Sequence, residues 1–464
     1  MNEQLILKII GKIADSENIS VWAVGGFVRD KLLNKIVKDI DFAVVGDGPQ
    51  FAHTVARKLK TPNIVVYPKF GTAMIDFQDY RLEFVTARSE SYNENSRKPI
   101  VTDSDLNTDL LRRDFTINCI AYGLNKDNFG VVYDPLDGTR DIQAKIIRTP
   151  LDPIVTFKDD PLRIMRAIRF ATQLGFEIEN TTFEALKQMR SRLEIISQER
   201  ITDELKKILL APRPSIGFSL LDEAGVLEII FPEMKAMKGV EQRDGYHHKD
   251  VFQHTLMVID NVAEVSDKFD LRFAALVHDI AKPVTKRFIE GAGWTFHGHD
   301  EIGARMLPKI FQRLKLPNAT LKFTQKLTRL HLRPIHLSEE GVTDSAMRRL
   351  LFQAGEDLED LLTLCRADIT SGNPERVKKH LANFDHVVNR LEEVEEKDRM
   401  KAFQSPVRGD EIMEVCGIPP GPKVGKLKKM IEEAILDDKI PNEHDAAYEY
   451  LLQIKDEVLR KTSK

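Results

Sequence analysis

Two aspartates one residue apart, Asp39 and Asp41, interrupt the apolar, β-branched stretch IVKDIDFAVV at residues 36–45. Side chains two positions apart on a β-strand point to the same face, so the two carboxylates are expected to converge while Ile40 and Phe42 pack on the other side. The two like charges repel each other, and a divalent cation relieves this repulsion. Such oxygen ligands suit Mg²⁺, which completes its shell with water and substrate phosphates. The pair therefore indicates metal-assisted phosphoryl chemistry; two solvated acids at an exposed strand end are the simpler alternative.

The elements that must position this pair are a strand, a glycine turn and a helix. VWAVGG (21–26) is an apolar run that ends in Gly25 and Gly26, and FVRDKLLNK (27–35) has helical spacing. Glycine permits a positive φ and lets the main chain approach a ligand closely, so the N–H groups of the turn can face a phosphate. Arg29 lies one turn into the helix and adds a positive charge. A glycine pair by itself is equally typical of an ordinary turn.

A third group of polar residues follows downstream. Arg112 and Arg113 stand next to Asp114 and Asn118, a set that can hold a triphosphate and hydrogen-bond a ribose hydroxyl. A surface charge cluster is the alternative interpretation. Glu83 alternates with apolar neighbours on a predicted strand, where it is either a third acid near the metal ions or the structural partner of an arginine.

GGFVRD followed by DIDF resembles the nucleotidyltransferase superfamily that includes DNA polymerase β, in the branch of the class II CCA-adding tRNA nucleotidyltransferases and bacterial poly(A) polymerases. The later motifs of that branch also occur in order over roughly residues 20–235, and an ordered series is far more specific than any one motif. They are LEFVTARSESY (82–92, strand and flexible loop), LRRDFTINCIAY (111–122, ribose recognition), VYDPLDGTRDI (132–142, hinge), FKDDPLRIMRAIRFA (157–171, nucleotide template) and ERITDELKKIL (199–209, neck helix). Within the loop region, the polar stretch SESYNENSRKP (89–99) predicts an irregular, mobile loop.

The template motif predicts a helix that opens at DDPLRIMRAIRF, with Pro161 in its first turn. Residues three apart lie on neighbouring positions of a helix, so Asp160 and Arg163 can share one face. A carboxylate can accept from the amino group of cytosine or adenine while an arginine donates to a ring acceptor, and uracil and guanine reverse that order. The resemblance implies that this pair acts as a protein template for CTP and ATP; an intrahelical ion pair is the alternative. Arg166 and Arg169 continue the basic face.

Histidines and acids in a second pattern occur after residue 236. His254, the adjacent His278 and Asp279, and Asp368 follow the order H…HD…D, which resembles the HD phosphohydrolase domain, in which four such side chains ligate a divalent metal. Neighbouring residues diverge by about 100° on a helix, so the metal is expected at a helix end or in a cleft between helices. Nitrogen and oxygen donors together favour a transition metal such as Mn or Ni, with Mg²⁺ as the alternative. The resemblance implies a phosphoester substrate, for example a 2′,3′-cyclic phosphate or a damaged RNA end.

Three more histidines lie in the same region. HGHDEIGA, which contains His297 and His299, resembles the additional histidine segment of some HD domains, and His331 follows. These imidazoles either support a second metal ion or lie on the surface.

The bulk composition fits a modular, cytoplasmic enzyme. The 464 residues carry 42% hydrophobic residues and a net charge of −4, which argues against a protein coated for nonspecific nucleic-acid binding. The three cysteines form no CxxC pair, so neither a disulfide framework nor a zinc ribbon is expected. No apolar run is long enough to cross a membrane, and the N-terminal residues predict an amphipathic helix rather than a targeting signal.

The resemblance implies an α+β chain with a polymerase β-like nucleotidyltransferase head, built on a mixed sheet with helices, followed by all-α neck/body, HD and tail domains. The expected boundaries are 1–150 for the head, 151–235 for the neck and body, 236–375 for the HD domain and 376–464 for the helical tail. The head is expected to bind Mg²⁺.

The activity implied is addition of C, C and A from CTP and ATP to the 3′ end of tRNA by a monomer or homodimer. A poly(A) polymerase, an enzyme that adds only CC or only A, and an HD phosphohydrolase with an RNA-binding head remain alternatives.

Overall fold

The computed structural model describes residues 2–61, 63–93, 96–241, 250–291, 293–337, 343–370, 373–399 and 406–460. The chain divides into two compact units, Met1–Lys235 and Ala236–Lys464. The four predicted domains remain a prediction in their finer boundaries.

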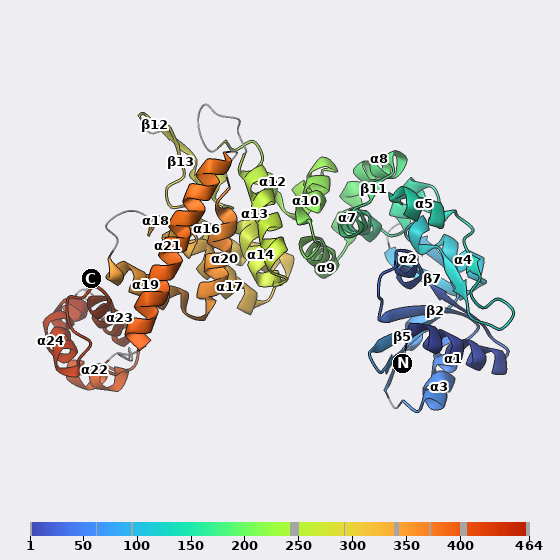
Figure 1. Cartoon of the computed structure of the whole chain (residues 1–464), viewed down its shortest axis with the longest axis horizontal. Coiled ribbons are helices and arrows are strands. Elements are labelled where there is room, and N and C mark those ends of the chain that lie inside the picture. Colours follow the sequence, from blue (N-terminus) through green and yellow to red (C-terminus); the bar gives the residue numbers. More distant parts are fainter. Residues whose placement is uncertain are drawn as a thin grey trace. The chain divides into compact units, whose positions relative to one another are not determined.

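The first unit contains a seven-stranded sheet with the order β3-β4-β5-β2-β1-β8-β9. Figure 1 labels its strands β2 and β5. Strands β2 and β5 run parallel, and the other neighbouring pairs run antiparallel, so the sheet is mixed, as expected. The strands are β1 (Ser20–Val24), β2 (Asp39–Val45), β3 (Ile64–Tyr67), β4 (Thr72–Phe77), β5 (Tyr80–Thr86), β8 (Ala121–Gly123) and β9 (Val132–Tyr133).

Alternation of apolar residues explains how the central strands pack. Ile40 and Phe42 of β2 are fully buried, and the Phe42 ring stacks on that of Phe84 in β5 with centroids 4.8 Å apart. Phe51 of helix α3 (Gly48–Leu59) packs edge-on against Phe84 at 5.7 Å, so this helix covers the apolar face. The other helices of the head are α1 (Glu3–Ser16), α2 (Gly26–Leu32), α4 (Leu106–Leu111) and α5 (Gly138–Ala144).

Residues 89–99 differ from the expected irregular loop. Strands β6 (Arg88–Asn93) and β7 (Ser96–Asp103) pair antiparallel as a hairpin, and residues 94–95 lie outside the described part. The polar composition misled the prediction because main-chain pairing between two strands does not require apolar side chains.

Helices make up the rest of the first unit: α6 (Pro153–Asp159), α7 (Leu162–Leu174), α8 (Asn180–Met189), α9 (Gln198–Leu209), α10 (Pro214–Glu223), α11 (Leu227–Ile230) and α12 (Pro232–Lys235). The template helix begins later than predicted. Asp160 is extended (φ −132°, ψ 96°) between α6 and α7, because proline disfavours the helical conformation in the residue before it. Asp160 therefore lies outside the helix that contains Arg163, so the two do not share a helical face as predicted, and their role stays a prediction.

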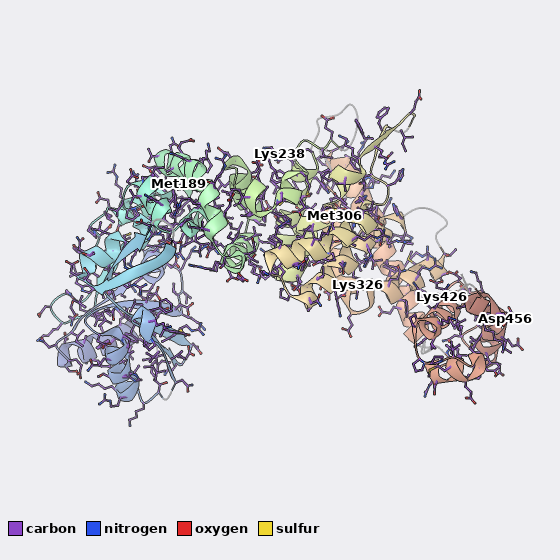
Figure 2. The ribbon with its side chains drawn as sticks, turned by 180° about the vertical axis from the view of Figure 1, so that it is seen from behind. Met189, Lys238, Met306, Lys326, Lys426 and Asp456 are labelled. Carbon is purple, nitrogen blue, oxygen red and sulfur yellow. The ribbon has the colours of Figure 1, made fainter. Side chains whose placement is uncertain are left out.

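The second unit is helical apart from one hairpin, β12 (Arg287–Ile289) and β13 (Gly293–Thr295), within its described residues. Its first helices are α13 (Val251–Val265), α14 (Phe269–Val277), α15 (Lys282–Thr285), α16 (His299–Leu314), α17 (Asn318–Leu330), α18 (Arg333–His336), α19 (Asp344–Ala354), α20 (Leu358–Asp368) and α21 (Pro374–Arg399). Figure 2 shows the unit from behind, with Met306 of α16 labelled.

The expected helical tail is present. Helices α22 (Gly409–Cys416), α23 (Pro422–Leu436) and α24 (His444–Arg460) surround a small core of their own, which includes Ile412, Leu427 and Leu451. None of the described helices combines the length and hydropathy that a membrane span requires.

Candidate active sites

The acidic strand end has the predicted arrangement. Asp39 opens β2 and is exposed, Asp41 follows on the same face, and the intervening Ile40 is fully buried. In the parallel pairing of β2 with β5, Asp41 is the register partner of Glu83. Directly paired residues on neighbouring strands project to the same face. Glu83 therefore lies beside the aspartates, as the third-acid interpretation requires.

The electrostatics of these acids fit a divalent cation. Burial raises the pKa of Asp41, and the negative charge of Asp39 raises it further, against the opposing effect of Arg113. Burial also raises the pKa of Glu83, followed by the charge of Asp41. A cation would relieve both effects. Since Mg²⁺ takes only one or two carboxylates and fills its remaining positions with water and phosphate oxygens, this small acidic set suits it.

The turn before α2 requires glycine at its first position. Gly25 has φ +71°, and a Cβ atom there would lie 2.9 Å from Nη1 of Arg113 and 3.7 Å from Oδ2 of Asp41. Any side chain would therefore be strained and would displace the guanidinium. The close approach of main chain, arginine and acid depends on the missing side chain.

A buried acid that the sequence analysis missed holds the two adjacent arginines. Asp109 in α4 is 1% exposed; Nη2 and Nε of Arg113 donate to its Oδ2 at 2.8 and 3.2 Å, and Nε of Arg112 donates to Oδ1 at 3.1 Å. Burial opposes ionisation, but Arg113 and Arg112 hold the pKa of Asp109 below its ordinary value. The spacing of three and four residues on a helix was the sequence signal that would have identified Asp109.

Asp114 is the centre of a second charged network. Its Oδ2 accepts from Nε of Arg166 at 2.8 Å, and its Oδ1 accepts from Nδ2 of Asn118 at 2.9 Å. Arg29 Nη1 then donates to Oδ1 of Asn118 at 2.8 Å. Burial opposes the charged form of Asp114, but Arg166 and the Asn118 amide hold its pKa well below the usual range. The aspartate therefore fixes Asn118 and Arg166 rather than facing water.

Helix α7 adds further cations. Nη2 of Arg163 donates to the main-chain oxygen of Arg112 at 2.5 Å, which ties the template motif to the ribose motif. Arg169 pairs with buried Glu204 at 2.6 Å, and its guanidinium lies 4.0 Å from the ring centroid of Phe170. Glu204 and Phe170 were also missed, and neither has a spacing signal that distinguishes it from core or surface residues.

These residues surround one cleft of about 1040 Å³. Asp39 alone among the predicted residues of the head does not line it. The predicted residues that do are Gly25, Gly26, Arg29, Asp41, Glu83, Arg112, Arg113, Asp114, Asn118, Asp160, Arg163, Arg166 and Arg169. A cavity lined by Asp41, Glu83 and many guanidinium groups can hold a polyphosphate and metal ions together.

The second unit brings its predicted histidines and acids together at helix ends. His254 lies in α13, His278 directly follows α14, and Asp368 ends α20. Nε2 of His254 lies 2.8 Å from Oδ1 of Asp368, and Nε2 of His278 lies 3.2 Å from Oδ2 of Asp279 and 3.3 Å from Oδ1 of Asp368. These residues lie at or near helix ends, where the metal site was expected, and their binding of a metal ion stays a prediction.

Two of the additional histidines join this group on its other side. Nε2 of His299 lies 3.3 Å and Nε2 of His331 3.8 Å from Oδ1 of Asp279. Oδ1 of Asp279 therefore forms one triplet of possible ligand atoms with His299 and His331. Its Oδ2 lies beside a second triplet, formed by His254, His278 and Asp368. His297 is exposed at the surface.

The hydrogen bonds of the rings prepare them for a metal ion. Nδ1 of His278, His299 and His331 each donates to a main-chain oxygen three residues earlier, at 2.7–2.8 Å. In the neutral form of each ring, which a metal ligand requires, this leaves the lone pair of Nε2 directed into the cluster. Nε2 of His278 and Oδ1 of Asp279 are buried, and their contacts of 3.2–3.3 Å with carboxylate and imidazole atoms of the cluster lack hydrogen-bond geometry. Burial disfavours the charged ring, yet Asp279 and Asp368 raise the pKa of His278 to about 10.

Comparisons with known proteins identify the families of both parts of the chain. Residues 21–148 match a family described as "Poly A polymerase head domain", residues 175–238 one described as "Probable RNA and SrmB-binding site of polymerase A", and residues 251–373 the "HD domain".

The "A-adding tRNA nucleotidyltransferase" of Deinococcus radiodurans is 33% identical over 339 residues, which cover 71% of this chain and 75% of the relative. The "Multifunctional CCA protein" of Pasteurella multocida is 32% identical over 373 residues, 75% of this chain and 83% of the relative. The chain belongs to the tRNA nucleotidyltransferase family.

Solved structures of such nucleotidyltransferases share the fold. "The structure of CCA-adding enzyme apo form II" aligns with a TM-score of 0.62 and 25% identity, over 98% of this chain and 96% of that one. A "tRNA nucleotidyltransferase complexed with a primer tRNA and an incoming ATP analog" aligns with a TM-score of 0.59 and 26% identity, over 82% and 99%. The predicted family, fold class and enzyme type are confirmed, and the roles of individual residues in this nucleotidyltransferase remain predictions.

Proposed function

We propose that the head adds C, C and A from CTP and ATP to the 3′ end of tRNA, with pyrophosphate as the leaving group. The observation that carries the proposal is the cleft in which Asp41 and Glu83 face the arginines of the ribose and template motifs. The two relatives named above, an A-adding enzyme and a multifunctional CCA protein, support the substrate class.

Each wall of the cleft has a distinct task in this proposal. Asp39 and Asp41, with Glu83 beside them, would hold Mg²⁺, which neutralises charge on the triphosphate and favours ionisation of the RNA 3′-hydroxyl. Arg112 and Arg113, held by Asp109, position the phosphates, because fixed guanidinium groups need no reorganisation as charge develops.

Base selection is assigned to Asp160 and Arg163. Both line the cleft, and Arg163 is tied to the main chain of Arg112. The extended backbone at Asp160 separates the carboxylate from the helical repeat, so the two side chains come from different local structures. Polar groups at a buried base edge reject the wrong base because they would be left unpaired.

The test is incubation of the purified protein with tRNA ending in N, NC or NCC and each labelled nucleotide separately, then in mixtures, with products sized on a gel. Extension of all three substrates by the correct nucleotide supports CCA addition. Extension only of tRNA ending in NCC would identify an A-adding enzyme, extension that stops after CC a CC-adding enzyme, and long adenylate tails a poly(A) polymerase.

We propose a second activity, metal-dependent hydrolysis of phosphoesters, for the HD domain. The supporting observation is the convergence of four imidazole Nε2 atoms on two carboxylates, with an orphaned nitrogen and oxygen among them. Nitrogen-rich ligand sets favour Mn²⁺, Ni²⁺ or a similar ion over Mg²⁺. His254, His278, Asp279 and Asp368 would hold one such ion, which supplies a hydroxide nucleophile at neutral pH. His299 and His331, facing the other oxygen of Asp279, would support a second.

Hydrolysis of cyclic phosphodiesters with added metals tests this activity. Opening of a 2′,3′-cyclic phosphate consumes one water molecule, forms a phosphomonoester and returns the ribose oxygen as a hydroxyl group. No turnover with Mn²⁺, Ni²⁺ or Mg²⁺, together with no metal bound to the second unit, would contradict it.

A further inference from the structure

The hairpin β12–β13 is joined at both ends to the HD cluster. It extends away from the helices of its unit in both views (Figures 1 and 2). Before it, α15 begins with Lys282, whose Nζ lies 2.6 Å from Oδ2 of Asp279. After it, α16 begins with the cluster residue His299. Both connections of the hairpin therefore include a residue that belongs to the cluster or contacts it.

Aromatic rings and lysines alternate along one side of this segment. Phe288 and Trp294 are direct cross-strand partners, with ring centroids 5.3 Å apart, and Nζ of Lys286 lies 4.3 Å from the Trp294 centroid. Closer to the cluster, Nζ of Lys282 lies 5.7 Å from the ring centroid of Phe296. Residues two apart on an extended segment share a face, so Lys286 lies with Phe288, and Phe296 with Trp294.

Stability of the hairpin explains only part of this pattern. A cross-strand aromatic pair stabilises a hairpin, which accounts for the Phe288–Trp294 contact. This pairing does not explain why Phe288 is 59% exposed. It also does not explain the two nearby lysines, Lys286 and Lys282, the second of which contacts Asp279. Exposed rings interleaved with cations are the features of surfaces that bind single-stranded nucleic acid, in which bases stack and phosphates meet positive charge.

We propose that this face, formed by Lys282, Lys286, Phe288, Trp294 and Phe296, binds the last nucleotides of a single-stranded RNA whose terminal phosphoester lies at the HD cluster. The proposal rests on the proposed hydrolase activity and narrows its substrate class to RNA ends rather than small phosphoesters. Bases stack on exposed Phe288 and on the half-buried rings of Trp294 and Phe296, and Lys286 contacts a backbone phosphate. Lys282, whose side chain is 13% exposed and pairs with Asp279, lies beside the terminal phosphoester. A protein partner would leave unexplained why the row ends at a cluster suited to phosphoester hydrolysis.

Tryptophan fluorescence tests binding without any turnover. The chain has two tryptophans, so in a Trp22→Phe variant all tryptophan emission comes from Trp294. A hexameric adenylate RNA should quench it saturably. Lys286→Gln should raise the Kd several-fold, since it removes a positive charge that a backbone phosphate contacts. The matched control is Arg287→Gln, on the opposite face of the same strand, which should stay within about twofold.

Absence of quenching, or equal weakening by Lys286→Gln and Arg287→Gln, would overturn the proposal. So would a concentration-dependent dimer that Phe288→Leu abolishes, because the face would then belong to a second copy of the chain.

Kinetics with full-length protein separate this inference from the hydrolase proposal. With Ni²⁺ or Mn²⁺, Phe288→Leu and Trp294→Leu should raise the KM for an RNA hexamer ending in a 2′,3′-cyclic phosphate about tenfold and leave kcat unchanged. Turnover of glycerol 1,2-cyclic phosphate, which has no base, should stay within about twofold, and Ile289→Ala on the opposite face should alter neither reaction. If both substrates are hydrolysed and the leucine variants change neither, the hairpin inference is wrong. If the wild type hydrolyses neither, the hydrolase proposal fails, and with it the assignment of this face to a substrate.

Discussion

Replacing Asp109 by asparagine should destabilise the first unit and weaken nucleotide binding together. The carboxylate is 1% exposed and is the shared acceptor of Arg112 and Arg113, whose side chains are each 18% exposed. Removing one partner of a buried ion pair costs about 3–5 kcal/mol, and partial solvation of the arginines places this case at the lower end, about 3 kcal/mol. In a unit of 235 residues this corresponds to a decrease in Tm of roughly 6–12 °C.

Differential scanning calorimetry is the suitable assay because it can resolve separate transitions of the two units. The matched control is Asp76→Asn. Asp76 pairs with Arg81 at 3.2 Å, but their side chains are 60% and 56% exposed, so the loss should stay below about 1 kcal/mol. A decrease in Tm for Asp109→Asn no larger than that of the control would refute the reasoning.

The effect should also depend on pH in a defined direction. The folded state lowers the pKa of Asp109 from its ordinary value of 3.8, so its contribution to stability is present above that value and is lost as the pH falls through the folded-state pKa. The stability difference between wild type and Asp109→Asn should therefore be constant near neutral pH and shrink below about pH 4. In nucleotide-addition assays the variant should raise the KM for CTP and ATP roughly tenfold, since the arginines lose their common anchor.

The remaining predictions address the proposed chemistry. Asp39→Asn and Asp41→Asn should each reduce nucleotide addition by orders of magnitude while tRNA binding in a filter assay persists; near-normal addition by both would remove them from the metal site. Asp160→Ala should relax discrimination against UTP and GTP, measured as ratios of kcat/KM, more than it slows the chemical step, and unchanged selectivity would leave Asp160 with only a structural role at the start of α7. His278→Ala combined with Asp279→Ala should abolish metal-stimulated phosphoester hydrolysis and leave nucleotide addition largely intact; loss of addition in a variant that is still folded by circular dichroism would show that the two sites are coupled.

Local patterns in the sequence were sufficient for much of the head. The alternation around Asp39 and Asp41 predicted a strand with both acids on one face and Ile40 buried, because the side-chain repeat of a strand is a local property. The glycine pair predicted the turn before α2, and Gly25 does adopt a positive φ. The order of histidines and acids predicted the HD cluster and its place at a helix end.

Other features depended on contacts between residues far apart in the chain. The pairing of β2 with β5 places Glu83 beside Asp41, and no local pattern reveals which strands become neighbours. Glu204 is identified only by its contact with Arg169, a residue on another helix. The conformation of Asp160 was predicted wrongly because Pro161 was taken as part of the first turn of a helix. Proline restricts the residue before it to extended conformations, so Asp160 lies between the end of α6 and the start of α7.

The amino-acid sequence by itself determined which residues carry charge, ligate metals and form each strand or helix, since these follow from side-chain chemistry and short-range periodicity. Only the tertiary structure decided which oxygen of Asp279 faces which histidines, and that Lys282 lies beside both Asp279 and the ring of Phe296. The physical reason is that burial, pKa and ligand geometry depend on distances between elements, and those distances are set by packing of the whole unit rather than by spacing along the chain.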